Sequence, residues 1–168
     1  LYMYVCGKIL DYKTWSKDDR RLITREYKPI PADLYFRQFE IDNAKNILKS
    51  HNIKKFIFMN TTVKAQIQLN KHWGAINFTK LIKLIKEYDS SIDIVTCIPS
   101  KHKYYGTPNL PGITVIKTNT IREAMSILSQ SSLIVTPEGG IHHAAGALNI
   151  PGIVLFGHFI SPDSTGYD

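Results

Sequence analysis

The sequence predicts an α/β fold built on a parallel β-sheet, for three reasons. Short apolar segments alternate along the chain with longer segments in which apolar residues recur at helical spacing. Within the short segments consecutive residues are apolar, which is typical of strands buried on both faces of a sheet. Polar residues, glycine and proline separate the two kinds of segment. Strands that alternate with helices in this way form parallel sheets.

The composition is that of a folded domain. The chain has 168 residues, of which 43% are hydrophobic and 21% charged, and this excludes a disordered protein. No apolar run reaches the roughly 18–20 residues that span a bilayer, and no signal peptide is evident. Cys6 and Cys97 have no metal-ligand spacing, which indicates free thiols in a reducing compartment.

The net charge of +7 favours anionic ligands or an anionic membrane surface as partners. The alternative is a basic surface that is merely solvated. No arginine-rich block or aromatic-interleaved motif indicates a nucleic-acid partner.

Residues 1–37 differ from the rest of the chain. A possible strand at residues 1–5 is followed by a polar, charged stretch and then by Pro29 and Pro31. We therefore expect residues 1–37 to be the tail of a preceding domain and a linker. Residues 38–168 are expected to form the folded domain. Because the chain starts at Leu1 rather than at a methionine, we expect it to be a fragment of a longer protein.

The regular pattern begins near residue 38. Apolar residues at helical spacing predict helices over residues 41–48 and 78–85, the second with lysines on its other face. Apolar runs predict strands over residues 55–59, 92–97 and 112–116, the last one after a Pro-Gly turn.

The second half of the domain continues the alternation. Thr120 and Glu123 fit a capping box, in which both side chains accept from free backbone N–H groups at a helix start. That helix is expected to run to about Gln130. The remaining elements are a strand at 133–135, an Ala-rich helix at 141–148 and a strand at 152–156.

Right-handed crossovers between these strands favour a Rossmann-like, doubly wound sheet with strand order 3-2-1-4-5. The chain reverses direction between the first and fourth strands, and ligands bind outside the carboxyl ends of the strands at such a point. The loops at residues 60–74 and 137–140 are expected to meet there.

Gly139 and Gly140 stand between the fourth strand and a short helix. Glycine lets the backbone approach a ligand, and the free N–H groups of a helix start bind phosphate. The alternative is that the pair makes only a tight turn. Glu138 is either an acid favoured by the helix dipole or a carboxylate near a nucleotide-sugar that accepts a hydroxyl or an amide proton. His142 and His143 point about 100° apart on a helix and so cannot easily share one role.

The other loop offers Lys71, which either neutralises a diphosphate or is simply solvated. Trp73 is expected to pack the loop. Thr61 and Thr62 either donate to phosphate or cap a turn. No metal-binding motif is evident, so we expect no metal and a diphosphate held by the lysine and the helix start.

Over about residues 30–168, the sequence resembles glycosyltransferase family 9, the ADP-heptose:lipopolysaccharide heptosyltransferases and their relatives. The family pattern has an acidic residue, a small residue, a glycine, a histidine three positions on, an Ala-rich helix, a proline and a strand ending in Phe/Tyr-Gly. The matching positions are Glu138, Gly139, Gly140, His143, residues 144–148, Pro151 and residues 155–157. A lysine before an aromatic residue, here Lys71 and Trp73, and a closing loop at residues 161–166 are also similar. Here Glu138 and Gly139 stand where the family often has Asp and then Ser or Thr.

The resemblance implies the C-terminal half of a GT-B glycosyltransferase, which moves a sugar from a nucleotide-diphosphate donor to a glycan or lipid-linked acceptor such as lipopolysaccharide. It implies that Lys71 contacts the diphosphate, that residues 138–140 hold the phosphates or the sugar, and that His143 lies beside them. Many members hold the ribose with an acid after the second strand, a role that Ser100 could partly replace.

The resemblance further implies inverting transfer without metal or cofactor. The family's general base lies in the N-terminal domain, so no catalytic residue is assigned, and we expect this chain to bind nucleotide without turnover. A cytoplasmic protein is expected, with peripheral contact at the inner face of the bacterial membrane. The alternatives are a GT-B-like nucleotide-sugar epimerase and a non-catalytic basic module that binds an acidic polymer or membrane.

Overall fold

The computed structural model describes residues 31–64, 71–101, 104–157 and 162–167. The possible strand at residues 1–5, the residue Cys6 and the proline Pro29 lie outside the described residues. The elements in chain order are α3 (Gln38–Ser50), β1 (Phe56–Met59), β2 (Thr62–Lys64), α4 (Ala75–Tyr88), β3 (Asp93–Pro99), β4 (Tyr104–Gly106), β5 (Thr114–Thr118), α5 (Ile121–Leu128), β6 (Leu133–Pro137), α6 (Gly140–Ala147), β7 (Gly152–Leu155) and α7 (Pro162–Thr165).

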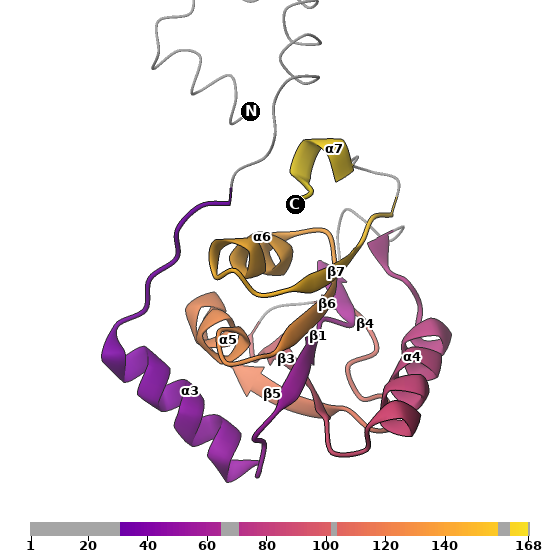
Figure 1. The fold of residues 1–168 in the computed structure, drawn as a ribbon, viewed down its shortest axis with the longest axis horizontal. Coiled ribbons are helices and arrows are strands. Elements are labelled where there is room, and N and C mark those ends of the chain that lie inside the picture. The colour runs from indigo at the N-terminus through magenta and orange to yellow at the C-terminus, as the bar shows by residue number, and fades with distance from the viewer. Residues whose placement is uncertain (1–30, 65–70, 102–103, 158–161, 168) are drawn as a thin grey trace, which may run out of the picture.

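Five parallel strands form the main sheet in the order β5-β3-β1-β6-β7 (Figure 1). Counted along the chain, this is the predicted order 3-2-1-4-5. β1 is central, since Ile57 is paired with Ile94 of β3 on one side and with Leu133 of β6 on the other. The predicted Rossmann-like parallel sheet is therefore confirmed.

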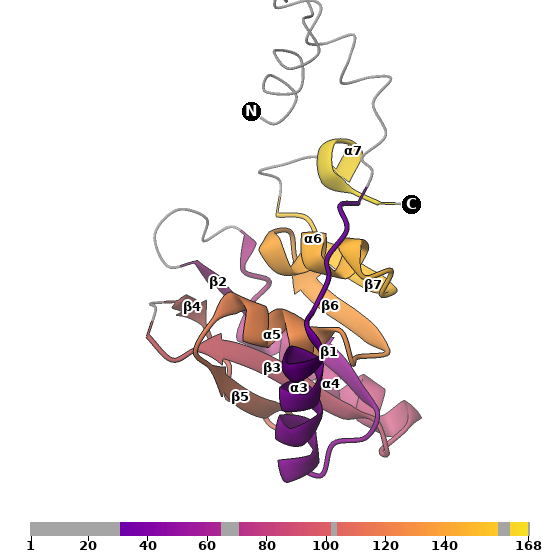
Figure 2. The same cartoon turned by 90° about the vertical axis from the view of Figure 1, so that its left-hand side faces the viewer.

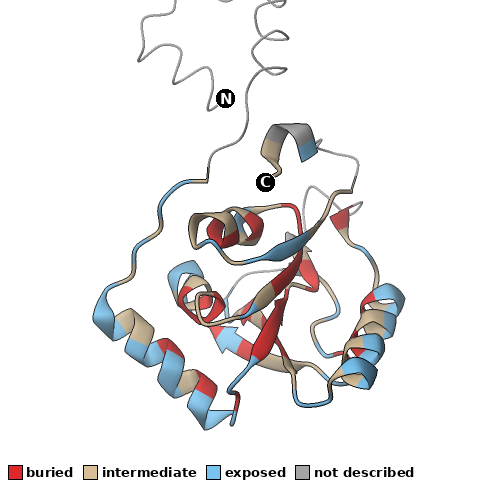
Figure 3. Cartoon of the chain, viewed as in Figure 1, coloured by how far each residue is buried: buried red, intermediate tan, exposed pale blue. Residues whose placement is uncertain are grey.

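Helices cover both faces of this sheet. α3, α5 and α6 lie on one face and α4 lies on the other, as Figures 1 and 2 show. Within β1, Phe56 and Phe58 pack into the core under α3, α5 and α6, whereas Ile57 and Met59 pack against α4. All four side chains are buried, and Figure 3 shows the central strands as the most buried part of the fold. This two-sided burial is why β1 is a continuous apolar run in the sequence.

The ends of several elements differ from the expected ones by a few residues. The third strand of the sheet, β5, begins at Thr114 rather than at Gly112. Gly112 has φ +84°, a left-handed conformation that forms the turn before the strand. α5 ends at Leu128 rather than near Gln130. At its start the hydroxyl of Thr120 accepts from the N–H of Glu123 at 3.1 Å, as predicted. The Glu123 carboxylate accepts from the N–H of Asn119 at 2.7 Å, one residue before the N-cap donor that a capping box uses.

A second, two-stranded sheet was not expected from the sequence. β2 and β4 pair antiparallel, with Thr62 opposite Gly106. Gly106 has φ +125°, and a Cβ atom there would lie 2.5 Å from the carbonyl oxygen of Thr61. Only glycine fits this approach, which ties the start of the loop after β1 to the segment between β3 and β5.

An ion pair at the surface joins helix α5 to helix α3. Arg122 Nε lies 2.6 Å from one carboxylate oxygen of Glu40 and Arg122 Nη2 lies 2.8 Å from the other. These hydrogen bonds, aided by the N–H of Arg37, lower the pKa of Glu40 to about 2.

Among the described residues, no helix is long and apolar enough to cross a membrane.

Candidate functional site

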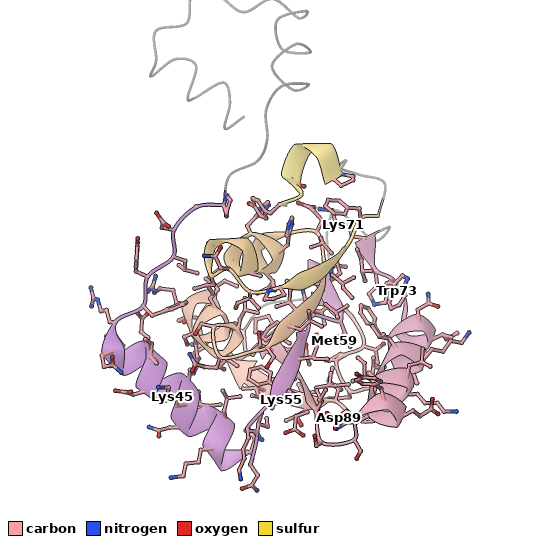
Figure 4. All side chains as sticks on the ribbon, in the orientation of Figure 1. Lys45, Lys55, Met59, Lys71, Trp73 and Asp89 are labelled. Atoms are coloured by element: carbon pink, nitrogen blue, oxygen red, sulfur yellow. The ribbon has the colours of Figure 1, made fainter. Side chains whose placement is uncertain are left out.

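The two predicted loops meet through a buried ion pair. The Nζ of Lys71 donates to the carboxylate of Glu138 and lies 3.5 Å from the carbonyl oxygen of the same residue. Each of the two residues is only 7% exposed. Glu138 directly follows β6, and Figure 4 shows Lys71 at the carboxyl end of β1, opposite the end that carries Lys55. The pair therefore lies at the predicted switch point of the sheet.

The imidazole of His143 continues this chain of polar contacts. Its Nε2 lies 3.7 Å from Oε1 of Glu138, and its Nδ1 lies 2.7 Å from the hydroxyl of Tyr167. The His143 side chain is 43% exposed, in contrast to the buried Glu138 carboxylate. One connected group of side chains therefore runs from the buried end of the loop to the surface, through Lys71, Glu138, His143 and Tyr167.

The start of α6 is open. Gly139 is the N-cap with φ +154° and ψ −163°, a conformation that is essentially restricted to glycine, and as a glycine it supplies no side-chain cap to the helix. Among the described residues, a Cβ atom built on Gly139 or on Gly140 would meet no atom within 4 Å. The start of α6 therefore leaves room beside these two glycines, directly after Glu138, whose carboxylate bonds to the Lys71 ammonium. Free N–H groups at a helix start bind anions.

Two threonines follow β1, and their hydroxyl groups have different surroundings. Thr62 donates from both its N–H and its hydroxyl to Oδ1 of Asn60, each at 3.3 Å, so it caps a turn. Asn60 in turn donates to the hydroxyl of Thr136 on β6 at 3.3 Å, a contact that was not predicted from the sequence.

The hydroxyl of Thr61 is fully buried and has no hydrogen-bond partner among the described residues. Trp73 packs its edge on Phe78, with ring centroids 5.2 Å apart.

Ser100 makes its hydrogen bond to a residue outside this group. It follows β3 at the carboxyl edge of the sheet, and its hydroxyl lies 3.1 Å from Oδ1 of Asn119. Its side chain is exposed, and no contact among the described residues joins it to Glu138 or Lys71. Its predicted role at a ribose stays a prediction.

Two residues of the site were not predicted as site residues from the sequence. His142 is 3% exposed and stacks on His143 with ring centroids 4.8 Å apart. Burial, and then the neighbouring His143, lower the pKa of His142, against a smaller raising effect of Glu138. Tyr167, 24 positions after His143, is the second. No sequence pattern marks it, because its contact depends on how the chain returns after β7.

Glu138, His142 and His143 could in principle hold a metal ion, since their ligand atoms lie within 4.8 Å of one another. The Lys71 ammonium already bonds to the Glu138 carboxylate, and a divalent cation at the same oxygens would be repelled by it. The geometry therefore favours the lysine as the cation of this site.

A comparison of the chain with protein-family models gives one family. Residues 18–166 match the model of glycosyltransferase family 9 (heptosyltransferase). The structure of E. coli ADP-heptose lps heptosyltransferase II matches with a TM-score of 0.57 and 20% identity, over 79% of this chain and 41% of that one. The glycosyl transferase family 9 structure from Veillonella parvula DSM 2008 matches with a TM-score of 0.62 and 14% identity, over 81% and 40%.

This chain therefore spans about two fifths of the length of these solved structures. A search of curated proteins found no match. The structural likeness confirms the predicted fold class, a Rossmann-like domain of the GT-B type.

Proposed function

The chain belongs to glycosyltransferase family 9, and we propose that residues 38–168 supply the donor site of an inverting, metal-independent glycosyltransferase. The donor is a nucleotide-diphosphate sugar, and the acceptor is a glycan or lipopolysaccharide. The observation that carries this proposal is the buried Lys71 ammonium near the start of α6, where the N-cap is a glycine with room beside it among the described residues. The predicted boundary after residue 37 remains a prediction.

A diphosphate fits this arrangement electrostatically. Its oxygens would accept from the first N–H groups of α6, and the helix dipole and Lys71 would offset its charge. When the bond from the sugar to the diphosphate breaks, negative charge builds up on the leaving group. Groups fixed in place beforehand stabilise that charge without reorganising, which lowers the barrier.

Glu138 serves two purposes in this proposal. It bonds to Lys71 and so fixes the position of the ammonium. A carboxylate accepts at several lone-pair positions, so those left free by Lys71 can accept from a hydroxyl of the donor sugar. Thr61, whose buried hydroxyl has no described partner, is the second candidate for a contact to the donor.

The acceptor hydroxyl would attack the anomeric carbon while the nucleoside diphosphate leaves. A base must take the proton of that hydroxyl, and no base is assigned to residues 38–168. We therefore expect the 168-residue chain to bind nucleotide without turnover.

Calorimetry with ADP-, UDP- and GDP-sugars tests the donor site. Lys71→Ala and Gly140→Val should each weaken binding, because the first removes the cation and the second fills the open space. Lys80→Ala is a matched control, since Lys80 is an exposed lysine of α4. Unchanged affinity in both site variants would show that the site is misplaced.

Peripheral contact with an anionic membrane is proposed through α4. Ile76, Leu84 and Tyr88 are 73%, 62% and 90% exposed, and their spacing places them on one face of the helix with Lys80. Apolar side chains among lysines suit a membrane interface. Co-sedimentation with vesicles should require anionic lipid and should weaken in Leu84→Gln; equal binding to neutral vesicles would contradict the proposal.

A further inference from the structure

The segment after α7 packs on α6 through Tyr167. Its hydroxyl lies 2.7 Å from Nδ1 of His143, and its ring centroid lies 5.0 Å from that of His142 and 5.8 Å from that of His143. Figure 2 shows α7 beside α6, at the end of the domain that carries the open helix start. Tyr167 therefore contacts both histidines of the site from a separate part of the chain.

Gly146 makes room for this tyrosine. A Cβ atom on Gly146 would lie 2.6 Å from Cδ2 and 2.7 Å from Cε2 of the Tyr167 ring. Glycine in a helix interior weakens the helix, so its presence in α6 needs a reason. The close approach of the ring supplies that reason, because no other residue leaves the tyrosine in place.

The contacts of His143 on its two ring nitrogens differ in kind. Nε2 faces Oε1 of Glu138 at 3.7 Å, and an ionised carboxylate only accepts hydrogen bonds, so a proton on Nε2 is favoured. Nδ1 then accepts from the phenolic O–H of Tyr167, which is both donor and acceptor. The two contacts together favour the tautomer with the proton on Nε2, on the side of Glu138.

We propose that Tyr167 is a positioning residue that holds His143 as the Nε2–H tautomer, with this N–H available to a phosphate oxygen of the donor. The inference rests on the proposed function for the identity of the ligand. The tautomer itself rests only on the contacts with Glu138 and Tyr167. Tyr167 acts through His143 and need not touch the donor.

The ¹⁵N chemical shifts of the imidazoles measure the tautomer in the full 168-residue chain, with His143→Gln to identify the signals of His143. The neutral wild type should show Nε2–H. Tyr167→Phe keeps the ring and removes the hydroxyl, so a larger share of Nδ1–H is expected. Tyr35→Phe is the matched control, because Tyr35 is 78% exposed in the segment before α3. An unchanged His143 tautomer in Tyr167→Phe would overturn the proposal.

Titration with ADP, UDP and GDP gives the second readout. Tyr167→Phe should weaken the nucleotide that binds best by roughly 2–10-fold, the net value of one hydrogen bond. Gly146→Ala should displace the ring and cause both changes. Weaker binding without a tautomer change would mean that Tyr167 only packs, and would also overturn the proposal. If the wild type binds none of the three, the proposed function fails, and the tautomer measurement still decides the role of Tyr167.

Discussion

Lys71 and Glu138 are 67 residues apart in the sequence, yet the Lys71 ammonium bonds to the Glu138 carboxylate inside the protein. The pair joins the loop after β1 to the end of β6. Neither charge is stable there alone, because desolvation strongly disfavours an unpaired buried ion.

Replacement of Lys71 by Met should therefore reduce the free energy of unfolding by about 3–5 kcal/mol, since it leaves the Glu138 carboxylate unpaired. The double variant Lys71→Met/Glu138→Leu should recover much of this loss. Urea unfolding measures both. Lys83→Met is the control, because Lys83 pairs with Glu87 at 3.7 Å on the surface, where such a pair contributes about 0.5 kcal/mol or less. If the single and double variants are equally unstable, the two charges are not coupled.

Gly139 and Gly140 should respond differently to replacement by Ala. At Gly139 the backbone conformation excludes other residues, so Gly139→Ala should destabilise the fold by about 1–3 kcal/mol. At Gly140 a Cβ atom meets nothing, so stability should change by less than about 0.5 kcal/mol while nucleotide affinity falls. Thermal unfolding and calorimetry separate the two effects. Equal destabilisation by both changes would argue that the pair is only a turn.

His142 should make stability depend on pH. Its pKa is lowered below its ordinary value of 6.5 by burial and by His143. The unfolded chain therefore binds the proton more readily, so the stabilisation is complete above pH 6.5 and is lost as pH falls through the lowered pKa. His142→Asn should flatten this part of the profile of unfolding free energy against pH, whereas the exposed His51→Asn should not. An unaltered slope in His142→Asn would assign the acid sensitivity to other groups.

Cys97 should be unreactive in the folded protein. Burial in β3 raises the pKa of its thiol to about 12, so almost no thiolate is present at pH 8. In a Cys6→Ser background, labelling with a thiol reagent should be slow in buffer and fast in urea. Rapid labelling of the folded chain would show that β3 is accessible.

Zinc should distinguish the cation role of Lys71 from a metal site. In the wild type, added Zn²⁺ should leave ADP affinity unchanged, since Lys71 bonds to Glu138. Lys71→Ala exposes the carboxylate beside His142 and His143, so zinc binding should be tighter in this variant than in the wild type. Tight zinc binding in the wild type that depends on Glu138 would contradict this assignment.

Local patterns in the sequence were sufficient to predict the five strands of the main sheet and the switch point. The apolar run at residues 55–59 predicted a buried strand, and the side chains of β1 do pack against helices on both faces of the sheet. Thr120 and Glu123 marked the start of α5 because capping acts over three residues. The pairing of β2 with β4 left no such mark, since Thr62 and Gly106 meet only after the chain has formed α4 and β3.

The sequence by itself determined the order of the five main-sheet strands and of the four helices that cover them, and it indicated that Lys71 and residues 138–140 would meet at one edge of the sheet. It did so because hydrophobic periodicity and glycine placement are local properties. The tertiary structure decided that Lys71 is held by Glu138 rather than solvated, that His142 is buried, and that Tyr167 reaches His143. Those outcomes depend on contacts between residues distant in sequence, whose energies exist only once the chain has folded.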